Sequence, residues 1–235
     1  MTQMGNMVSS ADAAEIAKFD ALAAEWWNPR GPMAPLHAMN PTRMGWIAER
    51  LGPLTGLRVL DVGCGAGLAS EWLARLGAHV TGLDAAGAAL DAARAHGAGL
   101  GIDYRDGTPE SLAEGGYDAV MALEVIEHVP PAERPAFVAA LARLIRPGGQ
   151  VFLSTLNRTR RSWVVAIFGA EQVLRWLPRG THDWKLFLTP AESGALLRGA
   201  GLAVTDVAGM VPSLRSGFRI ARDTGVNYLI AARKG

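Results

Sequence analysis

The chain has 235 residues, enough for one α/β domain with a substantial core and short for two full domains. Hydrophobic residues make up 49%, which excludes a disordered chain, and 23 basic against 22 acidic residues disfavour nucleic-acid binding through a whole-domain positive field. A single cysteine, Cys64, excludes an intrachain disulfide and favours a reducing, intracellular compartment.

The N-terminal residues carry neither a signal-peptide nor a transit-peptide pattern. The longest strongly apolar stretch, Trp163 to Ala170, is far shorter than the roughly 20 residues needed to cross a bilayer. We therefore expect a soluble, cytoplasmic protein.

The first 52 residues are predicted to form a helical segment that acts as a lid or entry region. Apolar residues recur at helical spacing from Ala11 to Trp27. Four prolines and a glycine between Asn28 and Pro41 are expected to break regular structure before a second helix runs from Thr42 to Leu51.

Strands and helices then alternate along the chain. The predicted strands are Leu57 to Val62, His79 to Leu83, Ile102 to Arg105, Tyr117 to Leu123 and Gln150 to Thr155. The predicted helices are Leu68 to Leu76, Ala85 to His96 and Pro131 to Ile145. This alternation predicts an α/β fold, a mostly parallel sheet with helices on both faces.

The pattern changes after the fifth predicted strand. Residues 157–190 are predicted to be an insertion over the sheet, followed by a helix from Pro190 to Gly199. Two closing strands, Leu202 to Val211 and Val226 to Ala232, flank a Ser/Arg/Gly-rich connection. We expect residues 1–235 to form a single domain.

The segment Asp61-Val-Gly63-Cys-Gly65-Ala-Gly67 lies between a predicted strand and helix, where open α/β sheets bind ligands. Glycines let the backbone turn sharply and approach a ligand, although glycines also serve turns that bind nothing. Asp84 ends the next strand and suits hydrogen bonding to ribose hydroxyls. Cys64 has no neighbours that indicate an activated thiol.

Two nucleotide-type cofactors compete for this loop. A dinucleotide-binding loop reads G-x-G-x-x-G and offers a helix N-terminus to a pyrophosphate, which would indicate an oxidoreductase. This loop reads G-x-G-x-G. Asp61 adds negative charge beside it, which suits a ligand that carries a cationic sulfonium and no phosphate. S-adenosylmethionine therefore fits better.

This pattern resembles the class I methyltransferases, which have a Rossmann-like, seven-stranded sheet ending in a reversed hairpin. The resemblance implies that Gly63, Gly65 and Gly67 border the amino-acid part of the cofactor and that Asp84 holds the ribose. Asp106, after the third strand, is either a contact near the adenine or a solvated loop acid.

A second group of polar residues, Glu124, Glu127 and His128, follows the fourth predicted strand. A helical turn here would place all three on one side, where two carboxylates and an imidazole could hold magnesium and a catechol. The alternative is that the acids are helix-end charges and the histidine caps a turn. His128 is also a candidate general base, because a phenol is a weak nucleophile at neutral pH.

The wider sequence closely resembles the ubiquinone biosynthesis O-methyltransferases over almost the whole chain. The resemblance rests on Trp26-Trp27, Pro35-Leu36-His37, Asn40-Pro41 and the segments LDVGCGAG, LEVIEHV, STLNRT, GAEQVLRWLPRGTHDW and GVNYL. These enzymes methylate a polyprenyl-hydroxyphenol and a demethylubiquinol, so the resemblance implies a polyprenylated catechol or quinol substrate. The alternative is a methyltransferase of another small phenol or a carboxylate.

The resemblance also implies roles for single residues. Arg43 would contact the carboxylate of the cofactor, and Leu123 its adenine side, where some members carry methionine. Glu124 and His128 would be catalytic, and Glu124, Glu127 and His128 match positions proposed to bind a metal in eukaryotic relatives.

Residues 158–179 place arginines beside an apolar run. This composition suits an interfacial helix that contacts anionic lipid, and the alternative is an ordinary core helix with a basic start. We expect peripheral association with the inner face of the membrane, contacts with other ubiquinone-pathway enzymes and no nucleic-acid partner. Thr181-His182-Asp183 supplies either a second base, a substrate contact or a loop cap. The non-enzymatic alternative for the whole protein is a membrane-associated scaffold that retains the fold and binds partners through residues 158–179.

Overall fold

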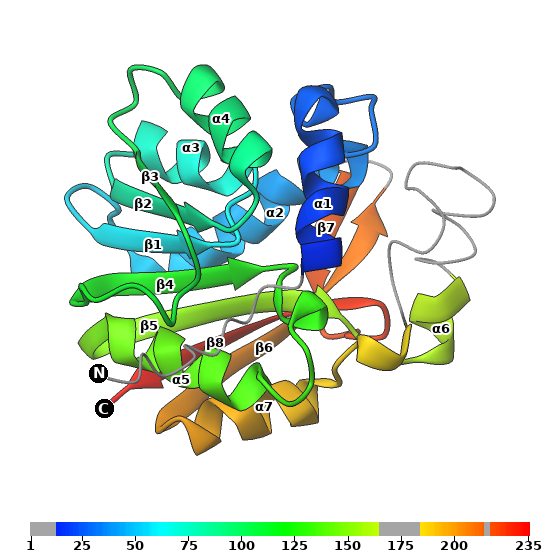
Figure 1. Ribbon diagram of the computed structural model, residues 1–235. Helices are drawn as coiled ribbons and strands as arrows, with labels where there is room; N and C mark the ends of the chain where they lie inside the picture. Colours follow the sequence, from blue (N-terminus) through cyan, green and yellow to red (C-terminus); the bar gives the residue numbers. More distant parts are fainter. Residues whose placement is uncertain (1–12, 165–183, 214–216) are drawn as a thin grey trace, which may run out of the picture.

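The computed structural model describes residues 13–164, 184–213 and 217–235. Within them, strands form one sheet in the order β3-β2-β1-β4-β5-β8-β6-β7 (Figure 1). The strands are β1 Arg58–Val62, β2 His79–Asp84, β3 Asp103–Asp106, β4 Tyr117–Leu123, β5 Ile145–Leu156, β6 Leu202–Ser213, β7 Gly217–Ala221 and β8 Asn227–Lys234. The first five are parallel, and β8 is antiparallel to β5 and β6.

Helices cover both faces of this sheet, as the sequence predicts (Figure 1). They are α1 Ala13–Leu22, α2 Ala34–Leu51, α3 Leu68–Arg75, α4 Gly87–His96, α5 Arg134–Leu144, α6 Arg160–Ser162 and α7 Pro190–Gly199, with the 3₁₀ turns η1 Ala23–Glu25, η2 Ile126–His128 and η4 Trp184–Leu186. In the described part of the chain, no helix has the length and apolar character needed to cross a membrane.

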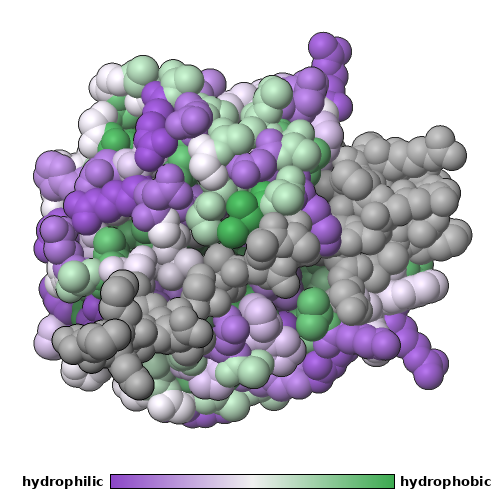
Figure 2. All heavy atoms as spheres, viewed as in Figure 1, coloured by the Kyte–Doolittle hydropathy of each residue, from purple (hydrophilic) through white to green (hydrophobic). Residues whose placement is uncertain are grey.

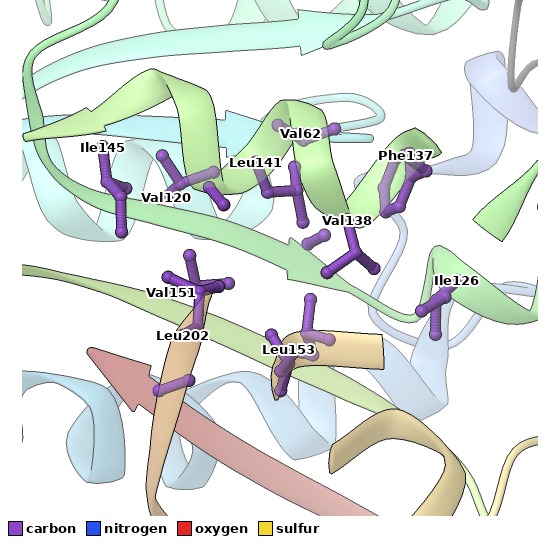
Figure 3. Close-up of a cluster of buried hydrophobic side chains, with 14 of the residues drawn as sticks. Val62, Val120, Ile126, Phe137, Val138, Leu141, Ile145, Val151, Leu153 and Leu202 are labelled. Atoms are coloured by element: carbon purple, nitrogen blue, oxygen red, sulfur yellow. The ribbon is translucent and has the colours of Figure 1, made fainter. Parts of the chain in front are cut away.

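Side chains along the central strands point alternately to the two faces of the sheet and form the core there. Ala119 and Met121 of β4 pack with α2 and α3 on one face, whereas Val120 and Ala122 pack with α5 on the other. Figure 3 shows Phe137, Val138 and Leu141 of α5 among side chains of β4 and β5. Each such buried side chain contributes about 1.5–3 kcal/mol, so the strand ends that carry polar residues rest on a rigid base.

The sheet has eight strands in the described residues, and the predicted number of seven is wrong. The additional strand, β7, lies in the Ser/Arg/Gly-rich connection between the two predicted closing strands. It pairs antiparallel with β6, from Gly209↔Ala221 to Ser213↔Gly217, and the Thr42 hydroxyl on α2 donates to the Phe218 carbonyl over 3.0 Å. Pairing with a long β6 thus gives strand structure to a segment too short to show a pattern.

The N-terminal segment also differs from the prediction. α1 ends at Leu22, and α2 begins at Ala34 rather than Thr42, so it contains Pro35 in its first turn and Pro41 inside. Proline is tolerated in a first turn because its missing N–H would be unpaired there. Pro41 removes one helical hydrogen bond, and burial of Met44 and other residues of α2 against the sheet compensates.

The two sides of the insertion meet at a short neck. The Trp184 indole N–H donates to the Thr159 carbonyl over 2.9 Å, and an Arg158 guanidinium N–H donates to the Phe187 carbonyl over 3.2 Å. The neck therefore joins the chain before and after residues 165–183. Those residues, which include Thr181-His182-Asp183 and most of the predicted lipid-contact segment, lie outside the described part of the structure.

The face of the molecule seen in Figure 2 shows small hydrophobic areas among hydrophilic ones. Among the described residues, the large hydrophobic side chains that are clearly exposed are Leu76, Trp163, Val164 and Val207. Two of these four directly precede residue 165, at the start of the predicted lipid-contact segment.

Candidate active site

The glycine-rich loop connects β1 to α3, and Gly63, Gly65 and Gly67 all have a left-handed backbone that favours glycine. Gly63 and Gly65 have φ values of 67° and 52°, in the left-handed region. A Cβ at Gly63 would lie 2.4 Å from Val125, and one at Gly65 would lie 2.2 Å from Trp26. The loop is thus packed between the chain after β4 and the N-terminal segment.

Asp84, at the end of β2, braces this loop. One carboxylate oxygen accepts from the Gly65 amide over 2.7 Å, and the other accepts from the Ala86 amide over 2.8 Å. Burial raises the pKa of Asp84, although these amide hydrogen bonds oppose the shift. The sequence predicts Asp84 as a ribose contact but does not reveal its hydrogen bond to the loop. Asp106 lies beside Asp84 in the β2–β3 register and is exposed.

Asp61 lies buried beneath the loop. Its carboxylate accepts from the Ser70 hydroxyl of α3 over 2.6 Å. Burial raises its pKa to about 6, the Ser70 hydrogen bond and the charge of Arg43 oppose this shift, and the charge of Asp84 adds to it. This site therefore favours a cationic group close to the loop, because a positive charge stabilises the ionised carboxylate.

Arg43 reaches the same region from α2. It is buried, its Nε donates to the Asn40 side-chain oxygen over 3.0 Å, and its Nη1 has no hydrogen-bond partner among the described residues. Burial lowers the pKa of Arg43, against the opposing charges of Glu124 and Asp61. An unpaired buried donor costs about 1–3 kcal/mol, so an anionic ligand group at Nη1 would stabilise this arrangement.

Leu123 is the last residue of β4 and packs, buried, in the cluster that includes α2 and α3. It stands between the loop region and the polar residues that follow β4. Its apolar side chain therefore lies at the strand end, directly before Glu124 in the chain.

Glu124 follows Leu123 and has an unusual backbone. Its φ is 59°, and among the described residues it is the one non-glycine residue in the left-handed region. This conformation costs roughly 1–2 kcal/mol. Its carboxylate accepts from the Ser154 hydroxyl over 2.7 Å, and the Asn227 amide nitrogen lies 3.0 Å from both carboxylate oxygens. Backbone strain at a strand end commonly marks a functional residue.

Glu127 belongs to the 3₁₀ turn η2 and is buried. One of its carboxylate oxygens accepts from the Thr155 hydroxyl over 2.8 Å, and the other has no hydrogen-bond partner in the described part of the chain. Burial raises the pKa of Glu127, the charge of Glu124 raises it further, and His128 opposes the shift.

The helical turn that would place all three polar residues on one side is not found. The turn begins only at Ile126, and Glu124 precedes it with left-handed backbone. Ser154 and Thr155 are neighbours on β5 and point to opposite faces, so they hold Glu124 and Glu127 on opposite sides of the strand end.

His128 ends η2, partly exposed, with the edge of its ring against Phe19 of α1. The ring centroids are 5.3 Å apart and the planes make an angle of 86°. In Figure 1, α1 stands across the carboxyl ends of β1, β2 and β4. The N-terminal segment therefore covers the edge of the sheet at which the polar residues gather.

Trp27 attaches the N-terminal segment to the glycine-rich loop. Its indole N–H donates to the Ala66 carbonyl over 3.0 Å, and its ring stacks on His96 with centroids 3.5 Å apart and an angle of 8°. His96 in turn shares a hydrogen bond of 2.6 Å with the buried Glu71 carboxylate. Sequence reasoning uses the Trp26-Trp27 pair only as a family motif and misses these contacts.

A divalent cation does not fit the three sequence-predicted ligands as they lie here. Among residues 13–164, 184–213 and 217–235, no group of three or more His, Cys, Asp or Glu side chains is arranged to hold a metal. Glu124 already accepts hydrogen bonds at both oxygens, and Glu127 faces the other side of β5.

Comparisons with known proteins identify the family. A family model described as a methyltransferase domain matches residues 60–153. The ubiquinone biosynthesis O-methyltransferase of Azorhizobium caulinodans is 48% identical, with 96% of this chain and 94% of that protein covered. The protein of the same name from Pseudomonas aeruginosa is 46% identical, with 97% and 99% covered.

Solved structures agree on the fold. A magnesium protoporphyrin IX methyltransferase from Synechocystis with bound SAM aligns with a TM-score of 0.66 and 19% identity, covering 97% of this chain and 100% of that one. A SAM-dependent methyltransferase from Thermotoga maritima aligns with a TM-score of 0.64 and 16% identity, covering 94% and 100%. The predicted Rossmann-like class I methyltransferase fold is confirmed, and the chain belongs to the ubiquinone biosynthesis O-methyltransferases.

Proposed function

We propose that this protein transfers a methyl group from S-adenosylmethionine to a catechol hydroxyl of polyprenylated ubiquinone precursors, at both O-methylation steps of the pathway. The observation that carries the proposal is identity of 46–48% to proteins of this name over nearly the full length. The polar residues after β4, beside the glycine-rich loop, supply the chemistry that such a reaction needs.

The residues around the loop suit S-adenosylmethionine. The unpaired Nη1 of Arg43 would bind the cofactor carboxylate, and Asp84 would accept from the ribose hydroxyls. Asp61, Gly63 and Gly65 would border the amino-acid part, and Leu123 would pack on the adenine side. The bound cofactor supplies an electrophilic methyl group on a cationic sulfonium.

The chain itself must activate and orient the acceptor. A catechol hydroxyl is a weak nucleophile at neutral pH, so His128 would accept its proton as the oxygen attacks. Glu124 would hold the acceptor through a hydrogen bond from a hydroxyl group. Transfer requires the oxygen, methyl carbon and sulfur in line, and positioning of this kind contributes much of the rate.

A magnesium ion remains a separate proposal, and no step above depends on it. It is supported by the carboxylate oxygens of Glu124 and Glu127, which are of the type that magnesium prefers, and by the unpartnered buried oxygen of Glu127. Because the described arrangement does not gather the ligands, binding would need Glu124 to exchange its present hydrogen bonds. Calorimetry with magnesium, on the native protein and on Glu127→Gln, tests this without an activity assay.

The decisive experiment measures methyl transfer from labelled S-adenosylmethionine to a short-chain demethylubiquinol, with and without chelator. We expect transfer by the native protein and loss of at least about tenfold in kcat for His128→Ala and for Glu124→Ala. Transfer that survives chelator keeps the substrate and removes the metal. Absence of transfer to this quinol, with transfer to another phenol or a carboxylate, would refute the substrate assignment.

We also propose that residues 158–179 bring the enzyme to anionic lipid at the inner face of the membrane, where a polyprenyl substrate resides and other ubiquinone-pathway enzymes could dock. Exposure of Trp163 and Val164 supports this. Arg158 and Arg161 are paired with Glu192 and Asp223, which reduces the charge they offer to lipid. Co-sedimentation with vesicles containing phosphatidylglycerol, compared with neutral vesicles, tests the proposal.

A further inference from the structure

Two sequence motifs have no role in the reaction described so far. The STLNRT segment contains the end of β5, and the GVNYL segment contains the start of β8. These strands are antiparallel neighbours in register Ser154↔Leu229 and Leu156↔Asn227. Ser154 and Asn227 therefore point to the same face of the sheet, two positions apart along the pair, and both meet Glu124 there.

Their contacts with Glu124 form a cradle around its carboxylate. Ser154 donates to one oxygen over 2.7 Å, and the Asn227 amide nitrogen lies 3.0 Å from both oxygens. Both side chains are buried, Ser154 completely. The backbone amide of Glu124 also donates to the Ser154 carbonyl over 2.9 Å, so one residue of β5 holds both the backbone and the side chain of Glu124.

The orientation of the Asn227 amide follows from charge. Its nitrogen must face the carboxylate, because two oxygens at that distance would repel each other. Its oxygen is buried and has no hydrogen-bond partner within residues 13–164, 184–213 and 217–235. A buried amide that leaves its own oxygen unpaired in order to hold a carboxylate is unfavourable for stability alone, which points to a functional reason for its position.

Asn227 is itself held in place without help from Glu124. The Asn157 amide N–H and side-chain nitrogen donate to the carbonyls of Val226 and Thr224, each over 2.8 Å. The Thr159 hydroxyl donates to the Gly225 carbonyl over 2.6 Å. The STLNRT segment thus fixes the loop that leads into β8, and this loop delivers Asn227 to a defined point.

We propose that Ser154 and Asn227 are positioning residues for methyl transfer, which hold Glu124 in the left-handed conformation from which it binds the acceptor hydroxyl. The inference rests on the proposed role of Glu124. It assigns Thr155 no part in this cradle, since that side chain holds Glu127 on the other side of β5.

The test uses Ser154→Ala, Asn227→Asp and, as matched control, Ser193→Ala. Asn227→Asp keeps the shape of the side chain but replaces its donor by a charge that repels Glu124. Ser193 is also a completely buried serine, and it is hydrogen-bonded over 2.6 Å to Tyr228 on the opposite face of β8. Asn227→Ala serves where the aspartate variant fails to fold, as judged by thermal unfolding.

We expect both cradle variants to lower kcat about ten- to a hundredfold, with the dissociation constant of S-adenosylmethionine unchanged, whereas Ser193→Ala stays close to the native kcat. Ser154→Thr, which keeps the hydroxyl, should recover part of the loss. In a Glu124→Ala background, Asn227→Asp should have little further effect, because a positioning residue acts through its partner.

The outcomes separate the two proposals. Full activity of Glu124→Ala removes the role of Glu124 and the cradle with it. An inactive Glu124→Ala together with a fully active Asn227→Asp overturns the cradle alone. Full additivity of Asn227→Asp and Glu124→Ala also overturns it, since Asn227 would then act independently.

Discussion

The proposed cofactor half and the proposed acceptor half of the site are built in different ways. Most of the cofactor half comes from neighbouring elements, β1, the glycine-rich loop, α3 and the end of β2, within residues 58–84, and only Arg43 of α2 and Leu123 of β4 are added from elsewhere. The acceptor half combines the end of β4 with β5, β8 and α1, so Glu124 meets a residue that lies 103 positions away. Local construction leaves a continuous motif in the sequence, whereas the second kind of construction divides its parts among distant segments.

The substitution with the largest expected effect tests whether cofactor binding depends on the left-handed backbone of the glycine-rich loop. Gly65→Ala places a Cβ 2.2 Å from Trp26 at a φ of 52°. We expect the free energy of unfolding to fall by about 2 kcal/mol or more, with loss of cofactor binding. Urea unfolding and calorimetry measure both. The control is Gly87→Ala, where a Cβ would meet nothing within 4 Å; equal losses in the two variants would contradict the prediction.

Asp84→Ala tests the side chain of the same half. It removes the brace on the Gly65 amide and the proposed ribose contact, so we expect the affinity for S-adenosylmethionine to fall by at least about tenfold, or 1.4 kcal/mol. Calorimetry measures the change. Asp106→Ala is the comparison, since that carboxylate lies beside Asp84 but is exposed. An equal loss for Asp106→Ala would instead give Asp106 a contact near the adenine.

The pH dependence of cofactor binding sharpens the comparison further. Since the pKa of Asp61 is raised to about 6, its carboxylate is mostly protonated below that pH and ionised above it. A cationic ligand favours the ionised form, so affinity should rise with pH towards 6 by at most about tenfold per unit and level off above. Calorimetry at pH 5, 6 and 7.5 measures this.

The control for the pH series is Asp61→Asn, which should bind with little dependence on pH. The same raised pKa acts on stability with the opposite sense. In the unliganded protein, stability should fall as pH rises from 3.8, the ordinary value, to about 6, because the folded state binds the proton more tightly than the unfolded state. A flat cofactor affinity across this range in the native protein would show that Asp61 stays ionised.

The smallest expected effect concerns the N-terminal segment, which contacts both halves. Trp27→Ala removes the stack on His96 and the hydrogen bond to Ala66. An aromatic stack contributes about 0.5–1.5 kcal/mol, so we expect cofactor dissociation to accelerate roughly two- to tenfold, with little change in the chemical step. Stopped-flow fluorescence measures dissociation. The control is Trp72→Phe, because Trp72 is a partly buried tryptophan of α3 that packs against the cluster containing Met44 and Leu73.

Prediction from sequence succeeded where the signal was local. The alternation of strands and helices predicts the fold, and the glycine-rich loop lies between β1 and α3 as predicted, because period and turn residues report on neighbouring positions. β7 was missed because its strand structure depends on pairing with β6. The sequence pattern does not predict the early start of α2, because prolines such as Pro35 and Pro41 usually break a helix, whereas packing against the sheet holds this one.

The acceptor half shows the limit more clearly. Glu124 and Glu127 could be singled out as acids after a strand, but their separation depends on the opposite directions of Ser154 and Thr155 on β5. Asn227 carried no signal beyond its place in a family motif. Only a folded sheet reveals that it reaches Glu124.

The neck fixes the end of β5 independently of the residues between its two sides. It is formed by the contacts of Trp184 with Thr159 and of Arg158 with Phe187. Because the chain leaves and rejoins the fold at one hydrogen-bonded point, a change in the number of residues between the two sides requires no movement of β5. The number of residues between the two sides of the neck can therefore change while the contacts that hold Glu124 at the end of β5 stay the same.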